Sequence, residues 1–142
     1  MIASETRTYE ARMKSLGDAL AFVEDYCERA GLARADTLRV AFIVEELFTN
    51  TVSHGYGGDC HSPVQVGLER REDAVLLEYA DAAAAHNPLD SFRGEPGGLA
   101  TTLSMRPVGG LGVYLIGRLI ETARYVREGD MNRLELLLPL GD

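Results

Sequence analysis

The chain has 142 residues, of which 46% are hydrophobic and 25% charged, a size and composition typical of one globular domain, here 1–142. Its formal net charge is −8 and it has no cluster of lysine or arginine, which argues against direct binding of nucleic acid or anionic lipid. No apolar run approaches the roughly 20 residues that span a bilayer, and residues 1–10 lack the basic start and apolar centre of a signal peptide, so we expect a cytoplasmic protein without a membrane partner.

The amino-terminal part predicts a strand and two helices. Residues 6–12 are weakly patterned and predict a strand at a sheet edge. From an N-cap at Ser15 to a stop at Gly31, apolar residues recur at three- and four-residue steps, which indicates an amphipathic helix that covers a sheet. Asp36 is predicted to cap a second helix that ends near Gly55.

A hairpin and a long irregular segment follow. Alternation over 64–69 and a strand-like run over 74–80 predict two antiparallel strands. From 82 to 108 there is little periodicity, and proline and glycine are frequent. Segments of this kind in small domains are usually functional or disordered.

The remaining residues predict a third helix and a closing hairpin. The helix opens at Gly110-Leu111-Gly112, and the strands 123–128 and 133–138 turn at Gly129-Asp130. The complete order of elements predicts an α+β fold, a two-layer sandwich of a mainly antiparallel sheet packed on three helices.

The second predicted helix carries the residues best suited to chemistry. Glu46 and Asn50 lie four positions apart, so a carboxylate and an amide oxygen project from one helix face into one small volume. Such a volume can hold Mg²⁺ and a phosphate, because Mg²⁺ prefers oxygen ligands. The alternative is a purely structural polar pair. Glu45 is most simply a solvated carboxylate.

Two further elements are candidates for the same site. Asp81 lies where the second strand of the first hairpin runs out. The Gly-Gly-Leu-Gly sequence at 109–112 leaves backbone amides unobstructed at a helix N-terminus, which suits phosphate, although a plain turn before a helix is the alternative. The cluster Asp59-Cys60-His61 could mimic metal ligands, but one turn supplies too few of them.

Together the three elements resemble the Bergerat-type ATPase family, which includes sensor histidine kinases, gyrase-type topoisomerases and the anti-sigma serine/threonine kinases. Glu46-Leu-Phe-Thr-Asn50 with His54-Gly55 is similar to the family's N-box, Tyr79-Ala-Asp81 with Asn87-Pro-Leu89 to its first glycine box, and 109–116 to its second. The small size and the His-Gly-Tyr after the N-box favour the anti-sigma kinase branch.

The resemblance implies a role for each candidate residue. Glu46 would be the general base that orients an attacking hydroxyl, and Asn50 would be a ligand of Mg²⁺. Asp81 would accept a hydrogen bond from the adenine amino group. Backbone amides near the phosphates would come from Gly110, Leu111 and Gly112. The 91–108 segment would be the ATP lid, with Arg106 as a phosphate contact.

The implied function is that of an ATP-dependent serine/threonine protein kinase of the anti-sigma type. With ATP and Mg²⁺ as cofactors, it would bind a sigma-like factor and phosphorylate a small antagonist protein of the STAS class. A homodimer is a reasonable expectation from the same resemblance.

The chain departs from the family pattern after Asp81. The family places a glycine two residues after the aspartate, whereas here Asp81 precedes the alanine run 82–85. Alanine disfavours a positive φ, which would weaken or abolish ATP binding, but it costs little if the backbone there is ordinary. We expect a retained but weaker site. The alternatives are a non-catalytic partner-binding module with a degenerate nucleotide site, and a regulator that binds ATP without consuming it.

Overall fold

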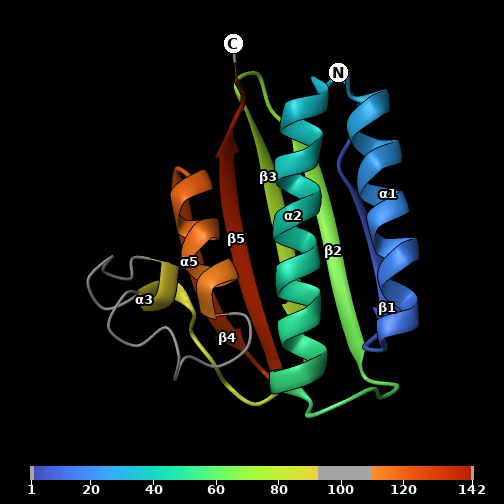
Figure 1. The fold of residues 1–142 in the computed structure, drawn as a ribbon, viewed down its shortest axis with the longest axis vertical. Coiled ribbons are helices and arrows are strands. Elements are labelled where there is room, and N and C mark those ends of the chain that lie inside the picture. The colour runs from blue at the N-terminus through green and yellow to red at the C-terminus, as the bar shows by residue number, and fades with distance from the viewer. Residues whose placement is uncertain (1, 93–109, 142) are drawn as a thin grey trace.

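The computed structural model describes residues 2–92 and 110–141, which form two layers (Figure 1). One layer is a five-stranded sheet, and the other contains the helices α1 (Leu16–Arg29), α2 (Arg34–Asn50) and α5 (Gly110–Leu119) on one face of that sheet. This confirms the predicted α+β sandwich. A short additional helix, α3 (Leu89–Phe92), packs beside α5. Arg106 and most of the predicted lid lie outside the described residues.

The sheet has the strand order β1-β2-β3-β5-β4, and every neighbouring pair is antiparallel. Its edge strand β1 is the weakly patterned strand of the amino-terminal part, as predicted. The last strand, β5, lies between β3 and β4, which places Asp81 directly opposite Asn132. The strands are β1 (Glu5–Glu10), β2 (Pro63–Arg70), β3 (Ala74–Asp81), β4 (Thr122–Glu128) and β5 (Met131–Pro139).

The core lies between the sheet and the helices. Alternate residues of the three central strands point to one face, because side chains alternate along a strand, and these are the buried ones. They meet the apolar stripe of α2. The core residues of the strands are Val64, Val66, Leu68, Val75, Leu77, Tyr79, Leu134, Leu136 and Leu138, and those of α2 include Val40, Ile43, Val44 and Leu47.

Ser15 occupies the N-cap position of α1, as predicted, whereas the predicted cap at Asp36 is wrong. Ser15 makes no capping hydrogen bond, because a 3₁₀ turn, η1 (Met13–Ser15), already gives it a helical backbone before α1 begins. The second helix starts at Arg34 and not at Asp36. The buried Asp36 carboxylate instead accepts hydrogen bonds from Arg39 (2.7 Å) and from the backbone N–H of Gly141 (3.0 Å), so it ties the carboxyl-terminal segment to α2.

The end of α2 changes geometry immediately after Asn50. A π-helical turn, η2 (Thr51–Gly55), continues the helix and ends it at Gly55, as predicted. Such turns widen the helix and are frequent at functional sites. Among residues 2–92 and 110–141, the helices are too short or too polar to cross a membrane.

Candidate functional site

Glu46 lies against the first turn of α5. A Cβ atom built on Gly112 would overlap the Glu46 carboxylate, with Oε1 at 3.0 Å, so the missing side chain makes the space in which this carboxylate sits. Glu46 is partly buried, whereas its neighbour Glu45 is exposed. The second helix and the glycine-rich helix start therefore meet, as the sequence predicted, and Glu46 is the inward-facing member of the pair.

The setting of Glu46 favours its protonated form. Burial, and then the negative charge of Glu45, raise the pKa of Glu46 above its usual value. A carboxylate with a raised pKa is a stronger proton acceptor than an ordinary one, which suits a general base working near neutral pH.

A buried hydrogen-bond chain joins the end of α2 to β3. Thr51 Oγ1 donates to Asp81 Oδ2 (2.9 Å) and lies 2.7 Å from the Tyr79 hydroxyl. Because the threonine has one proton, the Tyr79 hydroxyl must be the donor in the second bond. Burial raises the pKa of Tyr79 well above its usual value and so keeps that donor protonated. Thr51 directly follows Asn50, so this chain connects the predicted N-box with Asp81.

The alanine run has an ordinary backbone. No non-glycine residue in the described part of the chain has a positive φ, and this includes Ala83. Its side chain, 5% exposed, packs against Gly55, where a built Cβ would lie 3.1 Å from the Ala83 methyl carbon. The alanine methyl therefore occupies space that a glycine on another element leaves free. The conformational objection to a nucleotide site does not apply.

Side chains from other elements also hold the start of this run. The Ala82 N–H donates to the Tyr56 hydroxyl (2.7 Å), which in turn donates to the Pro63 carbonyl (3.0 Å). The Ala83 N–H donates to Asp81 Oδ1 (3.2 Å). Asp81 is thus held through both carboxylate oxygens and is only 8% exposed.

Three residues that hydrogen-bond to Asp81 or to the alanine run were not assigned from the sequence: Thr51, Tyr56 and Asn132. Thr51 had a detectable signal, because it lies four positions after Leu47 on an otherwise buried apolar stripe. Asn132 had none. It meets Asp81 across a pairing of strands that are not consecutive in sequence, which local patterns do not encode.

The donor atoms fit the cofactors that the resemblance implies. Glu46 and Asn50 are both partly exposed and lie one turn apart on α2, so one carboxylate and one amide oxygen face the same region, as a hard cation requires. Magnesium commonly takes one or two protein oxygens and completes its shell with phosphate and water. Gly110 begins α5 as predicted, and Leu111 is 43% exposed.

The cluster at 59–61 has other partners. Asp59 accepts a hydrogen bond from the Met13 N–H (3.0 Å), and His61 pairs with Glu10. Within residues 2–92 and 110–141, three or more His, Cys, Asp or Glu side chains nowhere gather as metal ligands would.

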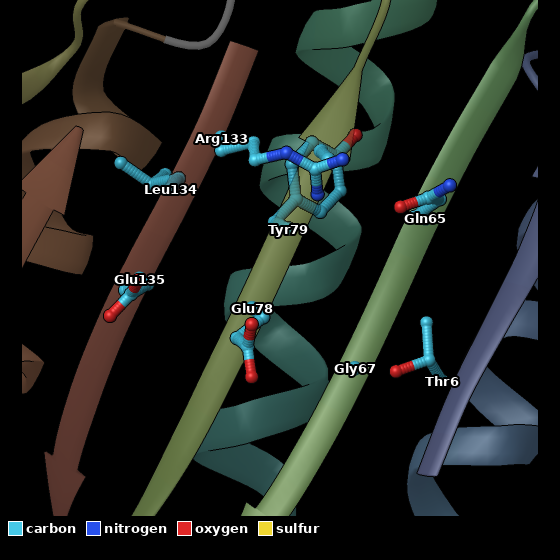
Figure 2. Close-up of a pocket in the computed structure, with 9 residues that line it drawn as sticks. Thr6, Gln65, Gly67, Glu78, Tyr79, Arg133, Leu134 and Glu135 are labelled. Atoms are coloured by element: carbon cyan, nitrogen blue, oxygen red, sulfur yellow. The ribbon is translucent and has the colours of Figure 1, made fainter. Parts of the chain in front are cut away.

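A separate pocket lies on the sheet face opposite the helices (Figure 2). Gly67 lines this pocket and leaves space beside Thr6, since a Cβ atom on Gly67 would lie 2.9 Å from Thr6 Oγ1. The polar side chains around it include Gln65, Glu78 and Arg133. Glu46, Asn50, Asp81 and Gly112 do not line this pocket, although Tyr79, whose hydroxyl contacts Thr51 on the helix side, borders it.

Comparison with known proteins agrees with this geometry. A search of curated proteins gave no significant match. The family model described as histidine kinase-like ATPase domain matches residues 9–138, a range that includes all the elements from α1 to β4 and nearly all of β5. The chain therefore belongs to the histidine kinase-like ATPase domain family.

Proposed function

We propose that this domain is an ATP-dependent serine/threonine protein kinase of the anti-sigma type. The observation that carries the proposal is the contact between Glu46 and Gly112. It brings a carboxylate of raised pKa to the first turn of α5, where backbone N–H groups and the helix dipole favour a phosphate. A proton acceptor beside a phosphate-binding turn is what phosphoryl transfer to a hydroxyl requires.

In this proposal each residue has one task. The γ-phosphoryl group of ATP would pass to the hydroxyl oxygen with ADP as the leaving group, and bound Mg²⁺ would neutralise the charge of the phosphates. Glu46 accepts the proton of the attacking serine or threonine hydroxyl, and Asn50 offers its amide oxygen to the metal. Asp81 accepts a hydrogen bond from the adenine amino group. Phosphate oxygens receive backbone N–H donors from Gly110, Leu111 and Gly112.

The proposed partners follow from the resemblance to the anti-sigma kinase branch. They are a sigma-like factor, which the domain binds, and a STAS-class antagonist protein, which it phosphorylates. We place this exchange in the cytoplasm and include a homodimer as the working assembly. The net charge of −8 favours protein partners over nucleic acid.

The first test is calorimetric titration of the purified protein with ATP and Mg²⁺. We expect saturable binding that Asn50→Ala weakens strongly. Glu45→Ala is the matched control, since this exposed carboxylate on the same helix should leave affinity unchanged. Absence of binding to the unmodified protein would refute the kinase and favour the non-catalytic partner-binding module.

The second test follows radiolabelled phosphate from ATP to a purified STAS-class protein. Glu46→Ala should abolish transfer while Mg²⁺–ATP binding persists, because the base acts on the hydroxyl and not on the nucleotide. Glu45→Ala should retain transfer. If the protein binds ATP but no variant yields a phosphoprotein, it would instead be a regulator that binds ATP without consuming it.

A further inference from the structure

The side-chain amide of Asn132 is the centre of the polar contacts around Asp81. Its Nδ2 donates to Asp81 Oδ1 (2.9 Å) and to the carbonyl oxygens of Ala83 (3.2 Å) and Ala84 (3.0 Å). An amide nitrogen has two hydrogens, so three acceptors use its whole capacity, with one hydrogen shared. This single group therefore connects β5 to the carboxylate and to the alanine run that follows it.

The oxygen of the same amide is equally occupied. Asn132 Oδ1 accepts hydrogen bonds from the Tyr125 hydroxyl (2.6 Å), the His86 backbone N–H (3.2 Å) and Arg127 (3.2 Å). The orientation of the amide is fixed by these partners, because a flip would set its oxygen against one carboxylate and two carbonyls. Arg127 also donates to the Ala83 carbonyl (2.8 Å), which strengthens the same attachment.

We infer that Asn132 is a positioning residue for nucleotide-base recognition, holding Asp81 in the orientation that reads the exocyclic amino group of adenine. Asn132 and the Ala83 N–H hold Oδ1, and Thr51 holds Oδ2. The carboxylate therefore cannot rotate, while an oxygen with one donor keeps a second lone pair for a ligand. The inference rests on the proposed function, since it assumes that Asp81 faces the base.

Asn132 also supplies hydrogen-bond partners to the backbone of the alanine run. Alanine side chains offer no hydrogen bonds, so the polar groups of residues 82–86 need partners from elsewhere in the fold. Tyr56 supplies one at Ala82, and Asn132 supplies three, at Ala83, Ala84 and His86. The segment that borders Asp81 is thus set in place before any ligand arrives, which lowers the ordering cost of binding.

The test compares ATP with purine riboside triphosphate, which lacks only the exocyclic amino group, by calorimetric titration with Mg²⁺. A hydrogen bond to a carboxylate held in place should make the unmodified protein prefer ATP by about tenfold or more. In Asn132→Ala we expect the preference to fall below about threefold, because Asp81 Oδ1 then loses its shorter hydrogen bond and the backbone of Ala83, its other donor, is no longer held by Asn132. Asn132→Ser keeps one hydroxyl donor and should give an intermediate preference. Arg133→Ala is the control, since Arg133 neighbours Asn132 on β5 but pairs with Glu128 and borders the pocket on the opposite sheet face.

A purely structural role would weaken both nucleotides equally, so an unchanged preference in Asn132→Ala overturns the inference. Urea unfolding will show whether Asn132→Ala folds. If it does not, Asn132→Ser replaces it in the test, and a preference of Asn132→Ser for ATP as large as that of the unmodified protein also overturns the inference. Equal affinity of the unmodified protein for both nucleotides overturns the inference but leaves ATP binding intact. Failure of the unmodified protein to bind either nucleotide overturns the proposed function as well.

Discussion

Substitution of Gly112 by alanine should move the Glu46 carboxylate while leaving the fold nearly as stable as before. The new methyl group would overlap that carboxylate, which is the free end of a flexible side chain and can swing away. Alanine in place of glycine in a helix stabilises by about 0.5–1 kcal/mol, and a side chain pushed about 30° off its preferred rotamer costs about 0.5–1.5 kcal/mol. The net change in the free energy of unfolding should therefore lie within about 1 kcal/mol of zero.

Two other glycines calibrate this expectation. Gly17 lies in the first turn of α1 with no atom within 4 Å of a built Cβ, so Gly17→Ala should stabilise by about 0.5–1 kcal/mol. At Gly117 the Cβ would overlap the backbone carbonyl of Phe92, which has no rotamer to change. Gly117→Ala should therefore destabilise by about 1–3 kcal/mol or more, because α3 and α5 must separate.

Urea unfolding of the three variants gives the stabilities, and ¹³C NMR titration of the Glu46 carboxyl reports its surroundings. In Gly112→Ala the carboxylate moves into solvent, so its raised pKa should fall towards the ordinary value of 4.5. A loss of stability in Gly112→Ala as large as that in Gly117→Ala would refute the reasoning. So would an unchanged pKa of Glu46.

Three further outcomes are expected. Folding raises the pKa of Glu46 above 4.5, so the contribution of this side chain to the free energy of unfolding is most favourable below pH 4.5 and is lost as the pH rises through the folded-state pKa. Glu46→Gln should therefore be more stable than the unmodified protein at pH 7 but not at pH 4, as urea unfolding would measure. Tyr56→Phe leaves the Ala82 N–H and the Pro63 carbonyl without their partner and should lower the free energy of unfolding by about 1–3 kcal/mol, and a change under a few tenths would contradict the bonding described. Ala83→Gly should not raise the affinity for Mg²⁺–ATP, and it should lower the free energy of unfolding by about 0.4–1 kcal/mol. In Gly55→Ala the new methyl group would crowd Ala83, so adding Ala83→Gly to that variant should restore part of the lost stability, as a double-mutant cycle would measure.

Local sequence signals predicted the elements better than their ends. Gly129 has a φ of 59°, the conformation that glycine favours, and the predicted closing hairpin turns there. The start of α5 at Gly110 was also correct. Ser15 holds the N-cap position of α1 without a capping hydrogen bond, because a local 3₁₀ turn precedes it, and Asp36 failed as a cap because α2 already begins at Arg34. A long-range partner, the Gly141 N–H, accounts for Asp36.

For the site as well, the sequence predicted which motifs come together but not the contacts made by residues outside those motifs. The contact of Glu46 with α5 could be expected from the resemblance, because the motifs imply that their elements share one site. The attachment of the alanine run could not, since it uses Tyr56 and Asn132, which belong to other elements. Whether Ala83 obstructs a nucleotide site depends on its φ angle and on its contact with Gly55, and the sequence around Ala83 predicts neither of these.

The placement of β5 between β3 and β4 has a consequence for the order of folding. The sheet cannot be completed by adding strands one at a time in sequence, because β4 pairs only with β5, and the β4–β5 hairpin joins the sheet through the pairing of β5 with β3. Asp81 and Asn132 are 51 residues apart, so their bond closes a long loop, a step that is entropically costly and slow. Asp81 acquires its full set of partners only when that step is finished. Selective binding of a nucleotide would therefore report that the chain has completed its folding.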